Sequence, residues 1–198
     1  MRENMNKFTL RMKMTMRMAV KATLLAALMF GLAAMTAAAN TSAAYQQTDP
    51  KLEASLIKQV HHALAMNPWY GVFDDLAYSV NGTEVTLTGE VVYPGTKEDA
   101  VASVKHIEGV TAVIDKITVL PASSMDYQIR RAEYRAIFSY AGLYRYAMGV
   151  NPSIHIIVST GHVTLVGYVD NQTDANLAYM RANSVPGVFS VTNNLKVD

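Results

Sequence analysis

The sequence predicts an α+β fold made of two tandem αββαβ units, each a three-stranded mixed sheet covered on one face by two helices. The first observation is a strand motif, Val-Thr-Leu-x-Gly-x-Val, which occurs at 85–91 and again 78 residues later at 163–169. The second is its register: from 80/158 to 120/198 there is no gap, and 11 of 41 aligned pairs are identical. The third is that a hairpin pattern precedes and a helical pattern follows each motif. Together they indicate an internal duplication.

The first forty residues do not belong to this fold. Basic residues precede an uncharged run at 22–39, and small residues follow at 37–39 and 42–44. This order is typical of a secretory signal peptide, so residues 1–44 are expected to be a signal peptide and short linker, cleaved after Ala39 or Ala44. An uncleaved anchor is the alternative, because the run is about long enough to span a bilayer.

Composition excludes several classes of protein. The chain contains no cysteine, which excludes disulfides, thiolate metal sites and a lipoprotein anchor. After Ala39 there are 11 Lys and Arg against 15 Asp and Glu, a net charge of −4. No long basic run is present, so nucleic acid is not an expected partner.

The first unit is expected over residues 49–120. Apolar residues at helical spacing, including Leu56, Val60 and Leu64, predict a helix that ends before Asn67-Pro68. An Asn81-Gly82 turn signal then separates two alternating strands. A second helix over 94–107 and a closing strand to residue 119 complete the unit.

The second unit is expected over residues 125–198 in the same order. Its first helix is predicted to begin near Met125 and to run on toward Gly149, with Gly142 as a weak point. Its apolar stripe is Ile129, Ala132, Ala136, Ile137 and Ala141. A Thr160-Gly161 turn would pair Ser159 with His162 and leave His155 opposite Val166. A helix over 171–182 and a last strand follow.

The two sheets are expected to have one apolar face each. The helices should cover Val85, Leu87, Val163 and Leu165, while the other face carries Thr86, Thr88, Thr164 and His162. We expect His155 and His162 to be solvated strand residues. Units of about 70 residues bury only about 60% of their unfolded surface, so the two units are expected to dock against each other.

These motifs resemble the BON domain, the bacterial osmotic-shock and nodulation module. The resemblance rests on 85–91 with Gly109-Val110-Thr111-Ala112-Val113, and on 163–169 with Gly187-Val188-Phe189-Ser190-Val191 and Asn193-Asn194-Leu195-Lys196-Val197. The first copy departs from the pattern at Asp115-Lys116-Ile117. The resemblance implies an exported envelope protein without catalytic activity that binds phospholipid membranes or envelope proteins. It carries over no catalytic residue, and it makes Gly89, Gly109, Gly167 and Gly187 residues of the fold.

No catalytic, cofactor-binding or metal-binding residues are predicted. No nucleophile elbow, phosphate loop or paired-acid motif surrounds the serines and carboxylates. His61 and His62 are adjacent on a helix and point about 100° apart, which disfavours a shared metal ion. The chain is therefore not expected to be an enzyme.

The region 127–146 is the candidate contact surface, because tyrosines and four arginines interleave there with one acid, Glu133, in an otherwise acidic chain. Such a helix suits a lipid headgroup surface. The alternative is that the tyrosines pack on the protein while the arginines are solvated. An apolar loop at 69–73 either packs between the units or forms an exposed insertion loop. The candidate contacts are Arg131, Tyr134, Arg135, Tyr144, Arg145, Tyr146, Trp69 and Tyr70.

The predicted function is that of a non-enzymatic periplasmic protein with two BON domains. It would need no cofactor, bind anionic phospholipid and support envelope integrity or osmotic stress tolerance. The alternative is a protein–protein interaction or chaperone-like module that holds a periplasmic partner.

Overall fold

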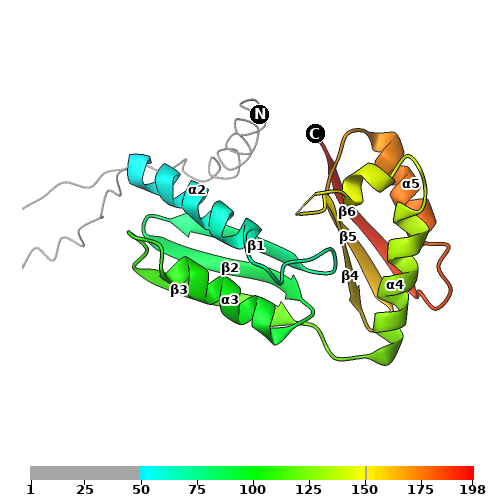
Figure 1. Cartoon of the computed structure of the whole chain (residues 1–198), viewed down its shortest axis with the longest axis horizontal. Helices are drawn as coiled ribbons and strands as arrows, with labels where there is room; N and C mark the ends of the chain where they lie inside the picture. The colour runs from blue at the N-terminus through cyan, green and yellow to red at the C-terminus, as the bar shows by residue number, and fades with distance from the viewer. Residues whose placement is uncertain (1–49, 150) are drawn as a thin grey trace, which may run out of the picture. The chain divides into compact units, whose positions relative to one another are not determined.

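Two tandem units make up the part of the chain that the computed structural model describes, residues 50–149 and 151–198 (Figure 1). The predicted signal peptide and linker lie outside the described residues. The first unit contains α2 Pro50–Ala65, β1 Asp75–Asn81, β2 Glu84–Val91, α3 Pro94–Lys105 and β3 Ala112–Val119. The second contains α4 Ser124–Phe138, the 3-10 helix η1 Tyr144–Ala147, β4 Ile154–Ser159, β5 His162–Val169, α5 Gln172–Ala182 and β6 Ser190–Val197.

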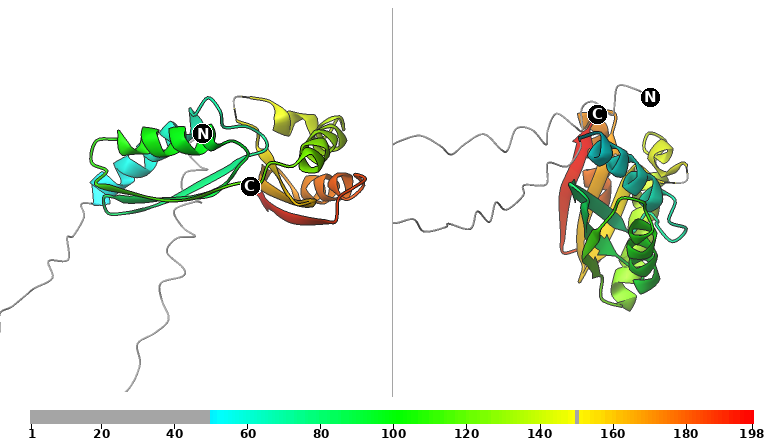
Figure 2. Two further views of the ribbon diagram at one scale, coloured as in Figure 1. Left: turned by 90° about the horizontal axis from the view of Figure 1, so that it is seen from below. Right: turned by 90° about the vertical axis from the view of Figure 1, so that its left-hand side faces the viewer.

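Each unit has one three-stranded mixed sheet. In the first, β1 pairs antiparallel with β2 and β2 pairs parallel with β3; in the second, β4, β5 and β6 repeat this arrangement. The parallel strands are joined through α3 or α5, since parallel neighbours need a long crossover. Figure 2 shows α2 and α3 on the same face of the first sheet. The predicted α+β architecture is confirmed.

The strand register is the same in both units. Val85 pairs with Val113 and Val163 pairs with Val191, a separation of 28 residues each time. Across the second hairpin, Ser159 pairs with His162, as the Thr160-Gly161 turn predicts. The duplication therefore preserved strand pairing as well as sequence.

Gly89 and Gly167 occupy equivalent places where only glycine fits. Their φ angles are +121° and +118°, a region that L side chains rarely adopt. A Cβ atom at Gly167 would lie 2.0 Å from the carbonyl oxygen of Ser153, and one at Gly89 would lie 2.0 Å from that of Asp75. The glycine of the repeated motif thus lets two antiparallel strands approach.

Two hydrophobic cores lie between the helices and the sheets. The predicted inward residues Val85, Leu87, Val163 and Leu165 are all at most 1% exposed. The first core adds Leu56, Val60, Leu64, Ala100 and Val104; the second adds Ile129, Ile137, Phe138, Leu143, Tyr146, Ile154, Ile156 and Val158. The apolar stripe predicted for α2 is thereby confirmed.

The prediction that the first helix of the second unit runs on toward Gly149 is wrong, because α4 ends at Phe138. A turn follows, and η1 begins at Tyr144. Leu143 and Tyr146 are buried in the second core. A continued helix would carry them about 8–12 Å past Phe138 along the helix axis, so burying them requires the chain to leave the helix.

Candidate functional site

The outward face of α4 carries exposed tyrosine and arginine side chains. Tyr127, Arg131, Tyr134 and Arg135 follow at spacings of four, three and one residues, which places them on one side of a helix. All four are exposed, and Cζ of Arg131 lies 5.8 Å from the ring centroid of Tyr127. Among the described residues, no carboxylate lies within 4.0 Å of the guanidinium groups of Arg131 and Arg135. Two arginines are therefore available to an anionic partner.

A shallow groove adjoins this face. Its volume is about 290 Å³, and it is lined by Val72, Phe73, Arg131, Tyr134 and Arg135. The ring of Phe73 meets the ring of Tyr134 edge-on, with centroids 6.3 Å apart. The groove thus combines an apolar lining with two guanidinium groups, a combination that suits a ligand with an anionic group and an apolar part.

The aromatic loop at 69–73 divides between two environments. Trp69 is 63% exposed, whereas the Tyr70 ring stacks on His155 with centroids 5.1 Å apart. The carbonyl of Val72 accepts a 2.7 Å hydrogen bond from the N–H of Ile156, which belongs to the edge strand β4. Trp69 therefore faces solvent, while its neighbours Tyr70 and Val72 pack on the second unit.

The prediction that His155 is a solvated strand residue is wrong. Its side chain is 7% exposed, since Tyr70 lies against it. Nδ1 of His155 donates to the carbonyl of Gly71 at 3.1 Å, and the Tyr70 hydroxyl lies 3.4 Å from Nε2. Burial lowers the pKa of His155, although the Gly71 carbonyl and nearby Asp75 oppose the shift. Neutral imidazole is the form that suits this contact.

The loop is held in shape by Asp74, which is 3% exposed. One oxygen accepts a hydrogen bond from the N–H of Val92 at 2.7 Å, and the other accepts from the N–H of Gly71 at 3.0 Å. Burial raises the pKa of Asp74, and these two hydrogen bonds oppose the shift. Burial also raises the pKa of Tyr70 to about 12.

The inward face of α4 is more polar than its sequence predicts. Asp126, Arg130 and Glu133 are 1%, 5% and 0% exposed. Asp126 accepts from the N–H groups of Thr160 and Gly161 at 2.9 and 2.8 Å, and so holds the β4–β5 turn. The sequence predicts surface arginines in this region and gives no sign of these buried charges, since helical spacing alone does not show which polar residues a sheet will cover.

Arg130 is tied to the sheet. Its Nη2 donates to the carbonyl of Val158 at 2.6 Å, while its Nε has no partner among the described residues. Burial lowers the pKa of Arg130, and the nearby carboxylates of Asp126 and Asp74 oppose the shift. Arg130 therefore serves the fold, unlike its neighbour Arg131.

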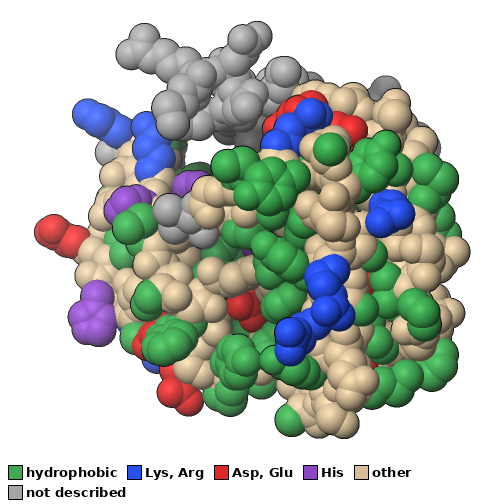
Figure 3. All heavy atoms as spheres, turned by 45° about the vertical axis from the view of Figure 1, so that its right-hand side comes forward, with side chains coloured by type: hydrophobic (Ala, Val, Ile, Leu, Met, Phe, Trp, Pro, Cys, Tyr) green, Lys and Arg blue, Asp and Glu red, His purple; other side chains and the backbone are tan. Residues whose placement is uncertain are grey.

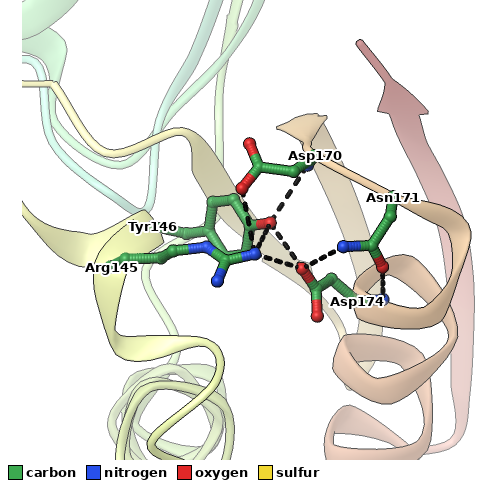
Figure 4. A network of polar contacts seen from close by, with 5 residues as sticks. All are labelled: Arg145, Tyr146, Asp170, Asn171 and Asp174. Carbon is green, nitrogen blue, oxygen red and sulfur yellow. Dashed lines mark hydrogen bonds and ion pairs between the residues drawn. The ribbon is translucent and has the colours of Figure 1, made fainter.

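Arg145 and Tyr146 belong to a polar network that joins η1 to the start of α5 (Figure 4). The Tyr146 hydroxyl donates to Oδ2 of Asp174 at 2.6 Å and accepts from the N–H of Asp170 at 3.0 Å. Arg145 Nη2 lies 2.6 Å from Asp174 and 2.9 Å from Asp170. The Asn171 amide donates to the same Asp174 oxygen at 2.9 Å.

This network changes how the candidate contacts are assigned. Tyr146 is 4% exposed and does not lie at the surface. Arg145 has two carboxylate partners and is less available to an external anion. Tyr144 is 57% exposed and therefore lies at the surface, as Trp69 does. The structure therefore brings Arg131, Tyr134 and Arg135 together on one face and ties Arg145 and Tyr146 into the fold.

The described residues contain no cluster of three or more His, Asp or Glu side chains that fits a metal ion. A hollow of about 450 Å³ does contain His62, His106 and Glu108, together with Lys58, Gln59, Ala63 and Ile107. Nδ1 of His106 is hydrogen-bonded to the carbonyl of Ala102 at 2.6 Å.

Within 50–149 and 151–198, no helix has the length and apolar character needed to cross a bilayer.

Comparisons with known proteins identify the repeated unit. The chain is 34% identical over 133 residues to Osmotically-inducible protein Y of Escherichia coli (strain K12), in an alignment that covers 62% of this chain and 61% of that protein. The chain thus spans about three fifths of the length of the curated relative it matches.

Two solved structures are also similar, both of CdsD, described as a structural protein of the type III secretion system of Chlamydia trachomatis. One is 13% identical with a TM-score of 0.30 and covers 73% of this chain and 92% of that chain. The other, a C-terminal domain, is 14% identical with a TM-score of 0.26 and covers 72% and 97%. Similarity this weak bears on neither the fold nor the function.

The family assignment rests on a model described as the BON domain, which matches residues 53–121 and 146–198. These ranges make up more than half of the chain. Both contain the repeated strand motif and the glycine that it requires. The chain belongs to the BON domain family.

Proposed function

We propose that this protein is an exported, non-enzymatic member of the family that binds anionic phospholipid through the outward face of α4. The observation that carries the proposal is the pair Arg131 and Arg135, which have no carboxylate partner among the described residues and lie beside exposed tyrosines. Support for envelope integrity during osmotic stress is part of this proposal, and it draws on the name of the Escherichia coli relative, Osmotically-inducible protein Y.

The arrangement suits a lipid headgroup surface for two physical reasons. Each arginine near an anionic bilayer gains about 1 kcal/mol, and the gain falls as salt screens the charges. Tyrosine and tryptophan favour the interface between water and hydrocarbon. In Figure 3, Lys and Arg side chains lie among hydrophobic side chains on one face of the protein.

The contact set follows the exposure of the side chains. Arg131, Tyr134 and Arg135 form its centre, with the groove that they line together with Val72 and Phe73. Exposed Trp69 and Tyr144 extend it. Tyr70, Arg145 and Tyr146 support the fold around it through the contacts described above.

The test is co-sedimentation of the mature protein with vesicles of phosphatidylglycerol or phosphatidylcholine at low and high salt. The variant is Arg131→Gln with Arg135→Gln. Its matched control, Lys58→Gln with Lys105→Gln, removes the same charge from exposed positions on α2 and α3 of the first unit. We expect salt-sensitive binding to the anionic vesicles that the arginine variant loses and the lysine variant retains.

Equal loss by both variants would show that net charge, and not this face, governs binding. Absence of binding by the native protein would overturn the lipid proposal. Lipid-independent capture of an envelope protein would then favour the interaction module predicted as the alternative.

Export to the periplasm is the second part of the proposal. It rests on the basic, apolar and small-residue order of residues 1–44. N-terminal sequencing of the protein recovered from the periplasmic fraction should begin at Asn40 or Tyr45. An intact N-terminus in a membrane fraction would instead support the uncleaved anchor.

A further inference from the structure

Glu133 is a fully buried carboxyl group with no partner. It is 0% exposed, and neither Oε1 nor Oε2 has a hydrogen-bond partner among the described residues. It lies on the inward stripe of α4, four residues from Ile129 and four from Ile137, both of which are buried in the second core. A charged carboxylate in such a place is strongly unfavourable.

The first unit shows that the fold does not require an acid here. In α2, Leu56, Val60 and Leu64 are buried at the same four-residue spacing, and the central position is a valine. The stripe of α4 therefore repeats that of α2 with Glu133 in the middle. The acid is a specific property of the second unit.

The charged groups on the elements packed against α4 are engaged elsewhere. On α4 itself, Arg130 donates to Val158 and Asp126 holds the β4–β5 turn. From α5, Arg181 donates to the Ala136 carbonyl at 2.8 Å. Arg145 of η1 is paired with Asp170 and Asp174. Asp74 accepts from the N–H groups of Gly71 and Val92, and His155 of β4 is bonded to the carbonyl of Gly71.

None of these groups forms an ion pair with Glu133 within 4.0 Å in the described part of the chain. Burial alone raises the pKa of Glu133 to about 8. At neutral pH the neutral acid is thus the form that the closed core accepts.

We propose that Glu133 makes the docking of α4 on the second sheet sensitive to pH, so that loss of its proton favours a state in which α4 is displaced and the carboxylate reaches water. This inference does not depend on lipid binding. Displacement of α4 would nevertheless move the outward face of the helix, because Arg131 and Arg135 lie on α4.

The direction of the effect follows from linkage. The displaced state has the ordinary pKa of 4.5, and the docked state has a pKa of about 8. Between these values the docked state holds a proton that the displaced state has lost, so displacement becomes about tenfold more favourable per pH unit. Below the pKa of the displaced state the docking equilibrium does not depend on pH, and above the pKa of the docked state the dependence levels off. Acid therefore stabilises α4 docking.

Hydrogen exchange followed by mass spectrometry tests the proposal on the full mature protein between pH 5 and 9. The variants are Glu133→Gln, which keeps the shape without the charge, and Glu133→Val, which copies Val60 of the first unit. Native and variant rates are compared at the same pH, so that the chemical dependence of exchange cancels. Peptides from α2 give the internal control.

We expect the protection of native α4, relative to either variant, to fall by about tenfold per pH unit from pH 5 to 8, with no change in α2. A ratio that stays constant with pH would overturn the proposal. A carbon-13 titration of the Glu133 carboxyl in the native protein decides the same question without a variant. A midpoint near 8 supports the proposal, and a midpoint near 4.5 contradicts it.

Discussion

The hydroxyl oxygen of Tyr146 lies 2.6 Å from Oδ2 of Asp174, so a short 3-10 helix is joined directly to the first turn of α5. Asp174 is also bonded to the N-cap residue Asn171, whose side chain accepts from the Asp174 N–H at 2.9 Å. A carboxylate in the first turn of a helix is favoured by the helix dipole. The network therefore stabilises α5 and fixes η1 with one set of contacts.

Replacing Tyr146 with Phe should lower the free energy of unfolding by about 1–2 kcal/mol, because the Asp170 N–H loses its acceptor and Asp174 loses a donor. Urea denaturation measures the change. Tyr144→Phe is the matched control; its ring is 57% exposed, and we expect a change of less than about 0.5 kcal/mol. Equal effects of the two variants would contradict the role assigned to the network.

Gly167→Ala should destabilise the second unit by about 3 kcal/mol or more. The new Cβ would meet the Ser153 carbonyl oxygen at 2.0 Å, at a φ of +118°. Gly95→Ala is the contrasting change, since it lies in the first turn of α3 with nothing within 4 Å. It should leave stability unchanged or raise it by about 0.4–1 kcal/mol. Thermal unfolding of both variants measures the difference, and a tolerated alanine at 167 would refute the close approach of the strands.

His155 should make a contribution to stability that is lost in acid, opposite in sign to the contribution of Glu133. Burial lowers the pKa of His155 in the folded state, so its contribution is complete above the unfolded pKa of about 6.5 and is lost as the pH falls below that value. His155→Gln should remove this part of the pH dependence. Urea denaturation from pH 7.5 to 5 measures it, with exposed His162→Gln as the control. Parallel profiles for native protein and His155→Gln would exclude the effect.

Trp69 is the only tryptophan of the chain and is 63% exposed, so its fluorescence reports on the proposed contact. On addition of phosphatidylglycerol vesicles we expect a blue-shifted emission and weaker quenching by acrylamide, because indole rings favour the bilayer interface. Phosphatidylcholine vesicles serve as the control. Binding without a spectral change would place Trp69 outside the contact.

The sequence by itself determined the duplication, the order of the main helices and strands, and the register of the second hairpin. These features depend on local physics: alternation for strands, four-residue spacing for helices, and glycine where φ must be positive. The pairing of Ser159 with His162 followed from a two-residue turn, and the positive φ angles at Gly89 and Gly167 agree with glycine in the repeated motif.

Only the tertiary structure decided which polar residues are buried and where α4 ends. Glu133 and Arg130 look like surface residues of a charged helix, yet the sheet covers them. His155 is buried because Tyr70, 85 residues earlier in the chain, lies against it. Such burial depends on neighbours distant in sequence, and neither periodicity nor composition contains that information. The exposed face with Arg131 and Arg135 remains a proposed contact surface, whereas Arg145 and Tyr146 belong to a tertiary network that no sequence pattern indicates.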